Sequence, residues 1–258
     1  LLGQNVNSYG NGRSGGVGEI GRIKNPKNIP KFVKLLQKID VIEGDYWVRF
    51  YSNHPKDMSD ELIDFVAQSK HFCHYIHLPL QSGDDEILKK MNRHYTAHQY
   101  LELAKKIKVK IPDVILTTDV IVGFPRESKK VFQNTVNLLE KVGFDMVFIS
   151  EYSPRSGTAA SKMNDDVPKE EKTRRKKFLN DEVLAKTVLS NNEKLVGKTE
   201  RVLVYKKDKH GFLVGRNFGL KDVRITNKIK GEHPSIGDFC IIEIIKANSW
   251  GLEGILVK

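Results

Sequence analysis

Apolar and polar positions in the first 150 residues switch repeatedly between two periodicities. Short runs rich in β-branched and aromatic residues, bounded by Gly, Pro, Asn or Asp, predict strands. These runs are Leu1–Asn7, Tyr46–Tyr51, Tyr75–Leu80, Ile115–Gly123 and Met146–Tyr152. Apolar residues at helical spacing fill the intervals and predict helices. Strands that alternate with helices form a parallel sheet, either open or closed into a barrel, so the first part is an α/β fold.

Local signals place the ends of several of these helices. One helix is expected from about Pro30 to Ile39, and another follows Ser59, which has the character of an N-cap. Thr96 and Gln99 have the spacing of a capping box at the start of a third. A fourth covers Val131–Val142 and ends at Gly143, a favourable residue for a helix C-terminus.

The pattern changes at Pro168. Residues 168–196 form a long charged helical pattern that ends at Gly197. Five short strands follow, at Arg201–Lys206, Phe212–Arg216, Val223–Thr226, Phe239–Lys246 and Gly254–Val257. So many short strands in so short a segment predict a small all-β barrel of OB-like size. We therefore expect three parts: an α/β domain at 1–167, a connecting helical segment at 168–196 and a β-barrel at 197–258.

The net charge of +11 lies mostly in the last two parts. Residues 168–258 hold 20 Lys and Arg against 12 Asp and Glu, whereas residues 1–167 hold 23 against 20. A basic C-terminal segment on a nearly neutral larger domain favours nucleic-acid binding. The alternative is a solvated Lys-rich surface that only keeps the chain in solution.

Two cysteines limit the redox and metal chemistry of this chain. They are too few for a disulfide framework, which favours a reducing, cytoplasmic setting. They are also too few for a Cys₄ zinc site or for the three-cysteine cradle of a catalytic iron–sulfur cluster. No apolar run approaches the length of a membrane span, and no N-terminal segment has the pattern of a signal peptide. The chain opens on Leu1-Leu2 without Met, so we expect that its sequence begins inside a domain.

Two motifs that suggest ligand binding are weak in their context. Gly16-Val17-Gly18-Glu19-Ile20-Gly21 matches a dinucleotide-binding pattern, but loop-like residues flank it on both sides and predict a surface loop. His71, His74 and His77 recur near Cys73. His74 and His77 are separated by an odd number of residues in an expected strand and face opposite sides. A minor alternative is that one of these histidines binds a metal together with ligands that are distant in the sequence.

Polar groups gather where each expected strand ends. They are Gln4 to Tyr9, Ser52 to Pro55, Gln81-Ser82-Gly83, Asp119 with Gly123-Phe124-Pro125, and Tyr152 to Gly157. Ligands of parallel α/β folds bind at this edge. These groups are amides and hydroxyls rather than a base and a nucleophile. They predict one extended polar ligand and chemistry supplied by a cofactor.

The same segments carry a family resemblance over nearly the whole chain. The segments are Leu1 to Gly10, His77-Leu78-Pro79-Leu80-Gln81-Ser82-Gly83, Met91-Asn92-Arg93-His94-Tyr95, Asp119 to Pro125, Gly143-Phe144-Asp145 and Tyr152 to Thr158. In this order they resemble the radical S-adenosylmethionine methylthiotransferases. Gly3-Gln4-Asn5-Val6-Asn7 resembles the tRNA branch of that family, the MiaB-type enzymes.

The resemblance implies a three-part enzyme. Its parts are a domain with an auxiliary cluster, a partial (β/α) TIM-like barrel whose first loop holds a radical cluster through C-x-x-x-C-x-x-C, and a TRAM module that binds RNA. Neither Cys73 nor Cys240 stands in that motif, so the chain corresponds to the second barrel strand onward. The reaction implied adds a methylthio group to C2 of isopentenyladenosine next to the tRNA anticodon. We expect the whole enzyme to use S-adenosylmethionine, two 4Fe-4S clusters and an electron donor, and this chain alone to hold no cluster and to be inactive.

The resemblance also implies roles for individual residues. The cofactor residues would be Gln4, Asn5, Ser52, Gln81, Ser82, Asp119, Gly123, Pro125, Tyr152 and Arg155. The RNA contacts would be Lys206, Lys207, Lys209, Phe212, Arg216, Arg224, Lys228 and Lys230, with Phe218 as a further stacking residue. Arg126 departs from the family, where Gly is usual. No residue is singled out as a catalytic base.

Three alternatives stay open. In the first, the chain belongs to another methylthiotransferase branch, which acts on threonylcarbamoyl-adenosine in tRNA or on a ribosomal protein. In the second, the chain is a non-catalytic RNA-binding protein on a barrel scaffold. An ordinary aldolase-type or phosphate-binding barrel would show a Lys or an acid pair at the strand ends, which this sequence lacks. A barrel without its first strand would expose a sheet edge at Leu1–Asn7, where a second chain could pair.

Overall fold

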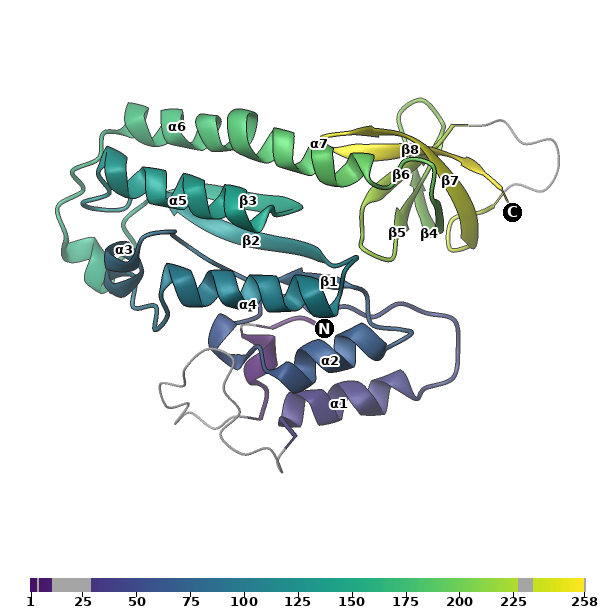
Figure 1. Ribbon diagram of the computed structural model, residues 1–258. Coiled ribbons are helices and arrows are strands. Elements are labelled where there is room, and N and C mark those ends of the chain that lie inside the picture. Colours follow the sequence, from purple (N-terminus) through teal and green to yellow (C-terminus); the bar gives the residue numbers. More distant parts are fainter. Residues whose placement is uncertain (4, 11–28, 227–233, 258) are drawn as a thin grey trace. The chain divides into compact units, whose positions relative to one another are not determined.

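The computed structural model describes the chain apart from residues 4, 11–28, 227–233 and 258 (Figure 1). It divides into two compact units, Leu1–Leu184 and Ala185–Lys258. The boundary falls inside the segment 168–196, and the assignment of that segment as a part of its own stays a prediction. Gln4, Lys228, Lys230 and the Gly16–Gly21 motif lie outside the described residues.

A three-stranded parallel sheet organises the first unit. Strands β1 (Tyr75–His77), β2 (Ile115–Val122) and β3 (Met146–Glu151) lie in the order β1-β2-β3. Tyr75 pairs with Ile115, and Thr117 pairs with Met146. Helix α4 (Ala97–Lys110) connects the first two strands and α5 (Lys129–Val142) the last two (Figure 1). The predicted α/β alternation with a parallel sheet is confirmed.

Buried side chains alternate along β2, as they must when one face of a strand packs on helices. Leu116, Thr118, Val120 and Val122 are buried on the helix side of the sheet. The Tyr100 hydroxyl of α4 donates a hydrogen bond to the Leu78 carbonyl at 2.5 Å and so ties this helix to the strand end. Thr117, Asp119 and Ile121 belong to the other face, which carries the polar residues discussed below.

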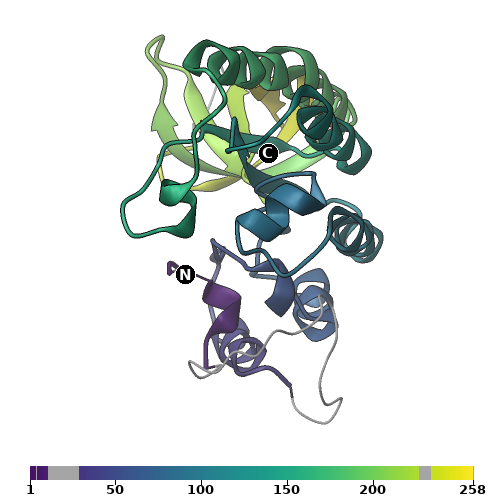
Figure 2. The ribbon, with the colours of Figure 1, turned by 90° about the vertical axis from the view of Figure 1, so that its left-hand side faces the viewer.

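The first unit contains further helices. They are α1 (Lys31–Asp40), α2 (Asp60–Gln68), α3 (Asp85–Lys90) and α6 (Lys169–Phe178), with the π-helical η4 (Leu179–Leu184) and the 3-10 turns η1 (Val6–Ser8), η2 (Pro55–Asp57) and η3 (Ala159–Lys162). Helices α1 and α2 pack side by side (Figure 2). No helix among the described residues is both long and apolar enough to cross a membrane.

The helix caps read from the sequence are confirmed. The Ser59 hydroxyl accepts the Leu62 N–H, and Thr96 and Gln99 form a reciprocal capping box. Gly143 ends α5 in the left-handed conformation at φ 65°. These signals act within one helical turn, so the sequence suffices to locate them.

The two strands predicted nearest the N-terminus are wrong. Described residues of Leu1–Asn7 form no strand, because Asn5 takes the left-handed conformation and Val6–Ser8 turn as η1. In Tyr46–Tyr51 only Val48 bridges, to Phe72, while the Phe50 side chain is buried between Phe32 and Phe72. Side-chain burial, rather than strand pairing, explains the strand-like composition. The sheet edge expected at Leu1–Asn7 is therefore not formed.

The second unit is a closed β-barrel preceded in the chain by α7 (Ala185–Glu193). Its strands are β4 (Thr199–Lys207), β5 (Leu213–Asn217), β6 (Asp222–Ile225), β7 (Phe239–Asn248) and β8 (Gly251–Leu256), in the order β4-β5-β6-β8-β7. Val202, Val204, Val223 and Ile242 fill the core. A Cβ on Gly215 would overlap Val202, so glycine there allows close approach of β5 and β4. The predicted small all-β barrel is confirmed.

Candidate functional site

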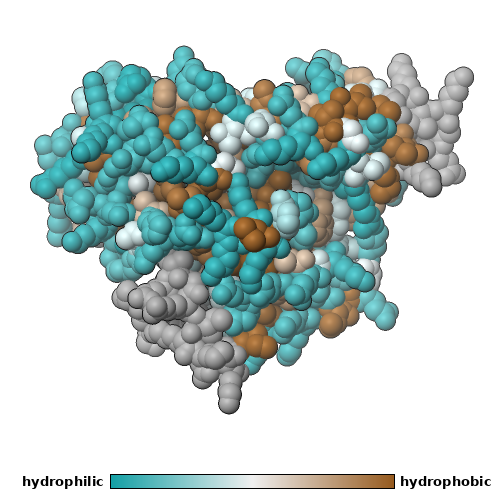
Figure 3. Space-filling model, in the orientation of Figure 1, coloured by the Kyte–Doolittle hydropathy of each residue, from teal (hydrophilic) through white to brown (hydrophobic). Residues whose placement is uncertain are grey.

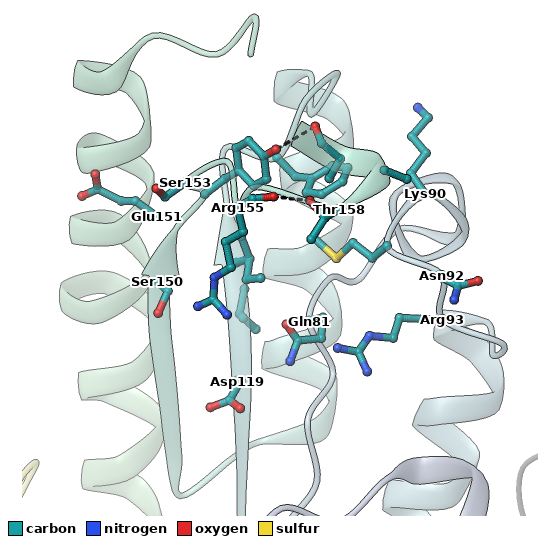
Figure 4. A pocket seen from close by; sticks show the side chains of 17 residues that line it. Gln81, Lys90, Asn92, Arg93, Asp119, Ser150, Glu151, Ser153, Arg155 and Thr158 are labelled. Atoms are coloured by element: carbon teal, nitrogen blue, oxygen red, sulfur yellow. Dashed lines mark hydrogen bonds between the residues drawn. The ribbon is translucent and has the colours of Figure 1, made fainter. Parts of the chain in front are cut away.

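A pocket of about 700 Å³ opens at the carboxyl ends of β2 and β3 in the first unit (Figure 4). This is the size of a small-molecule site and the edge at which parallel α/β folds bind ligands. Its lining residues are Gln81, Lys90, Met91, Asn92, Arg93, Asp119, Val120, Ile121, Phe124, Ser150, Glu151, Tyr152, Ser153, Arg155, Thr158, Ala159 and Ala160.

Four of the cofactor residues expected from the sequence come together in this pocket: Gln81, Asp119, Tyr152 and Arg155. Gln81 adopts φ 74°, in the left-handed region that residues other than glycine rarely adopt. Its N–H donates to the Asp119 carbonyl at 2.8 Å, and its carbonyl accepts the Ile121 N–H at 3.0 Å. These backbone bonds fix Gln81 beside β2, with its side chain pointing into the pocket (Figure 4).

Other expected cofactor residues do not line the pocket. Ser82 is fully buried, with its hydroxyl 3.5 Å from Thr135 of α5. Asn5 and Ser52 both have left-handed backbones, and the Val6 N–H donates to the Ser52 carbonyl at 3.2 Å, so their segments lie together. Gly123 and Pro125 flank Phe124, which does line the pocket.

Charged residues to which the sequence analysis assigned no role fix the backbone of Gly123. Its N–H donates to the Glu127 carboxylate at 2.5 Å, and at φ 71° a Cβ there would overlap the Lys172 side chain. Arg175 of α6 donates to the same carboxylate at 2.7 Å, and both side chains are buried. Burial raises the pKa of Glu127, while the Gly123 N–H and Arg175 act in the opposite direction. This buried pair fixes the loop between β2 and α5 at the pocket wall.

A second anchor holds the loop after β3. Lys172 lies 2.6 Å from an Asp165 oxygen and donates to the Tyr152 carbonyl at 3.3 Å. The Tyr152 hydroxyl donates to the Ala160 carbonyl at 2.9 Å, and its ring packs edge-on against Phe124. Tyr152 therefore presents its ring, rather than a free hydroxyl, to the pocket.

A contact with His77 orients the Asp119 carboxylate at the pocket. His77 is buried, with Nδ1 2.9 Å from the Thr117 hydroxyl and Nε2 3.2 Å from Asp119 Oδ2. Because Nε2 faces a carboxylate, it carries the proton and donates. The Asp119 side chain is 40% exposed, so it retains acceptor capacity for a ligand. His74 bonds a different carboxylate, that of Asp113, at 2.8 Å.

The pocket also contains residues to which the sequence assigned no role. Lys90, Asn92 and Arg93 enter from the segment that ends α3, a helix capped by the Asp84 carboxylate. Asn92 adopts φ 57° and directs the chain back toward the sheet. The motif Met91-Asn92-Arg93-His94-Tyr95 was visible in the sequence, but its distance from any expected strand end hid its place in the pocket.

The cysteines do not fit a cluster site. Cys73 and Cys240 are buried, and burial raises the pKa of the first to about 12 and of the second to about 11. Thiolate, not thiol, is the metal ligand. Within the described ranges, no group of three or more His, Cys, Asp and Glu side chains is placed to hold a metal ion.

The second unit displays arginines stacked on aromatic rings. Arg216 lies 4.2 Å from the centre of the Tyr205 ring, and Arg224 lies 4.3 Å from that of Phe212. The two arginines also pair with Asp222 and Asp208, each at 2.9 Å. The sequence predicted Phe212 and both arginines as RNA contacts but missed Tyr205.

The other predicted RNA contacts of the second unit lie at the surface. Lys206, Lys207 and Lys209 are exposed, and Phe218 is half-buried. Hydrophobic residues gather over β7 and β8 (Figure 3), where Ile245 is 45% exposed and Trp250 of the connecting turn 61%. The sequence assigned no role to Trp250.

Two family models match separate parts of this chain. Residues 21–139 match the Radical SAM superfamily, and residues 193–257 match the TRAM domain. The chain thus combines a radical SAM segment with a TRAM domain, as the resemblance implied. Coproporphyrinogen III oxidase from Escherichia coli, described as a radical SAM enzyme, has a similar fold with a TM-score of 0.50 at 14% identity. The match covers 91% of this chain and 57% of that one.

Curated relatives of this chain carry the name of a tRNA-modifying synthase. The chain is 43% identical over 256 residues to a tRNA-2-methylthio-N(6)-dimethylallyladenosine synthase from Clostridium botulinum, covering 98% of this chain and 53% of that protein. It is 39% identical to the protein of that name from Thermodesulfovibrio yellowstonii, covering 100% and 55%. The predicted resemblance to the tRNA branch is confirmed. The chain spans about half the length of the curated relatives it matches.

Proposed function

We propose that this chain is the barrel and RNA-binding part of a tRNA methylthiotransferase. The whole protein would add a methylthio group to C2 of isopentenyladenosine beside the anticodon. The observation that carries this proposal is the 39–43% identity to enzymes of that name along the whole chain. The pocket at the expected strand ends supports it independently.

The pocket suits S-adenosylmethionine, a ligand with both polar and apolar parts. Gln81 and Asp119 would supply hydrogen bonds and charge, and Phe124 and Tyr152 an apolar wall. When bound, this cofactor supplies the methyl group and the radical. Asn5, Ser52, Ser82, Gly123 and Pro125 would contribute by holding the surrounding loops. The described residues offer no cluster ligands, so we infer that two 4Fe-4S clusters and an electron donor require the rest of the protein and that this chain alone is inactive.

The second unit would bind the tRNA. Exposed lysines beside arginine–aromatic pairs combine charge for phosphates with flat groups for bases. Lys206, Lys207 and Lys209 are the proposed phosphate contacts.

The decisive experiment is equilibrium binding to two anticodon stem-loop RNAs in the presence of S-adenosylmethionine. One RNA carries isopentenyladenosine at the target position and the other carries unmodified adenosine. We expect weak cofactor binding, because the cluster that would hold its methionyl end is not part of this chain, and tighter binding of the isopentenylated RNA. Equal affinity for both RNAs together with no cofactor binding would instead indicate a non-catalytic RNA-binding protein.

A further inference from the structure

Two arginines enter the pocket of the first unit from different segments. Arg93 follows α3, and Arg155 follows β3. Figure 4 shows their guanidinium groups directed into the pocket from its two sides, with Gln81 between them. In the same view Asp119 lies further down β2. Two planar cations therefore face the same pocket.

Neither arginine is neutralised by the described residues. The Arg93 Nε atom is buried without a hydrogen-bond partner, and the structure gives the Arg155 side chain no hydrogen bond or ion pair within the described part of the chain. The two acidic residues of the lining are engaged elsewhere. Asp119 accepts from His77, and Glu151 accepts from Thr173 at 3.2 Å. Arg155 is exposed to solvent, but a buried charged donor such as Arg93 Nε is costly to leave without a partner, which points to a ligand that supplies an acceptor.

The surroundings of Arg93 agree with an uncompensated charge. Burial, followed by the charges of Arg93 and Lys56, lowers the pKa of nearby His54 to about 4, and the charge of Asp57 acts in the opposite direction. At neutral pH His54 is therefore uncharged, and its Nδ1 accepts the Lys56 N–H at 3.2 Å. The region around Arg93 is electropositive before any ligand binds.

The backbone holds both arginines in place. The Arg93 N–H donates to the Leu88 carbonyl at 2.8 Å. The neighbouring Tyr95 hydroxyl lies 3.0 Å from the Leu80 carbonyl, to which it donates. The Thr158 hydroxyl donates to the Arg155 carbonyl at 2.8 Å. These bonds fix the backbone from which each arginine side chain extends, which lowers the entropy lost when a ligand binds.

We propose that Arg93 and Arg155 together bind one phosphodiester group of an RNA strand whose neighbouring nucleoside enters the pocket. This inference rests on the proposed function, because it places the RNA substrate in the first unit as well as on the TRAM domain. Guanidinium groups match the paired oxygens of phosphate. A nucleoside inserted into the pocket brings its own phosphates to the walls that the two arginines line. The methionyl carboxylate of S-adenosylmethionine is the competing anion.

The test compares the charge-removing variants Arg93→Gln, Arg155→Gln and the double variant with Lys141→Gln. Lys141 is exposed at the end of α5 and does not line the pocket. Affinity for the isopentenylated stem-loop is measured across a range of salt concentrations. We expect each arginine variant to weaken binding about tenfold, the size of a charge-assisted hydrogen bond. The salt slope is the slope of the logarithm of affinity against the logarithm of salt concentration. Its magnitude should fall by about 0.7, the value for one single-stranded phosphate. The fall should be the same in the single and the double variants, because the two arginines share one phosphate. Lys141→Gln should change neither quantity.

A second measurement locates the phosphate. Stem-loops with a single neutral methylphosphonate linkage are tested in turn next to the target nucleoside. At one linkage the wild-type chain should lose about tenfold in affinity, and the double variant should lose nothing further. Melting temperatures within the range of the Lys141→Gln control establish that the variants are folded.

The outcomes separate this inference from the proposed function. If the variants lose S-adenosylmethionine binding, measured by calorimetry, but keep RNA affinity, the arginines bind the carboxylate and the inference is overturned. It is also overturned if both arginine variants behave like Lys141→Gln. If the wild-type chain binds no stem-loop, the proposed function itself fails.

Discussion

Arginine occurs in two different settings in the two units of this chain. In the β-barrel, Arg216 and Arg224 stack on aromatic rings and pair with carboxylates at the surface. In the first unit, Arg175 is buried in an ion pair, whereas Arg93 and Arg155 have no carboxylate partner among the described residues. Arginines that pair with carboxylates therefore stabilise the fold or form part of an adaptable surface. Arginines that line a pocket and lack a carboxylate partner indicate a binding site for an anion.

The largest expected effect contrasts a buried pair with an exposed one. Arg175→Met should destabilise the first unit by about 3–5 kcal/mol, because it leaves the Glu127 carboxylate buried without its partner. Arg216→Met removes an exposed pair with Asp222 and should cost about 1 kcal/mol or less. Urea unfolding followed by circular dichroism measures both values. Equal costs for the two variants would show that the burial of Arg175 does not determine its contribution.

How far the sequence could predict this arrangement depends on the range of the interactions. Caps such as Ser59 and Thr96 act within one turn and were predicted correctly. The strand ends also brought Gln81, Asp119, Tyr152 and Arg155 to one edge as expected, because parallel strands end on the same side. The Glu127–Arg175 pair joins residues 48 positions apart, and no local pattern reveals it.

Arg93 shows a second limit of sequence reasoning. It reaches the pocket because α3 and the left-handed Asn92 return the chain to the sheet, and neither feature was predicted. The failure at Tyr46–Tyr51 has a related cause. Its aromatic composition reflects packing of Phe50 against Phe32 and Phe72, contacts made with other parts of the chain. Composition alone does not distinguish such burial from strand pairing.

The next prediction concerns the surface charge of the β-barrel, for comparison with the pocket arginines. Replacing Lys206, Lys207 and Lys209 together by Gln should reduce the salt slope of RNA binding by about 2, or about 0.7 for each phosphate that is no longer neutralised. The affinity should fall to a similar extent for both stem-loops, since phosphates carry no sequence information. A charge-matched control replaces the exposed Lys38, Lys105 and Lys141 of the first unit. An equal loss in this control would assign the effect to net charge alone.

A smaller effect is expected at the floor of the pocket. His77→Met removes the donor that orients Asp119 and should weaken S-adenosylmethionine binding about fivefold, the value of one ordinary hydrogen bond. His77→Gln keeps an amide donor and should restore most of the affinity. In an Asp119→Asn background His77→Met should have little further effect, because the two residues act as one unit. Calorimetry measures all four variants, and additive losses would contradict a positioning role for His77.

The smallest expected effect concerns Glu171, a half-buried carboxylate that also pairs with Arg175. Arg174 and Arg175 hold the pKa of the Glu171 carboxylate at about 2, below its usual value of 4.5. A carboxylate whose pKa is lowered by folding stabilises the folded state above its unfolded pKa. That contribution is lost as the pH falls from about 4.5 toward about 2. Glu171→Gln should therefore cost less than about 1 kcal/mol at pH 7, because the group is largely screened by solvent.

The pH dependence separates this contribution from general effects of charge. Urea unfolding of the wild type and Glu171→Gln should converge as the pH falls from about 6 through about 4 to about 3. Glu140→Gln on α5 provides a control that removes one exposed carboxylate. If the stability difference between Glu171→Gln and the wild type stayed constant over this range, the two arginines would not act on Glu171 through its ionised form. Arg175 would then stabilise the first unit through Glu127 alone.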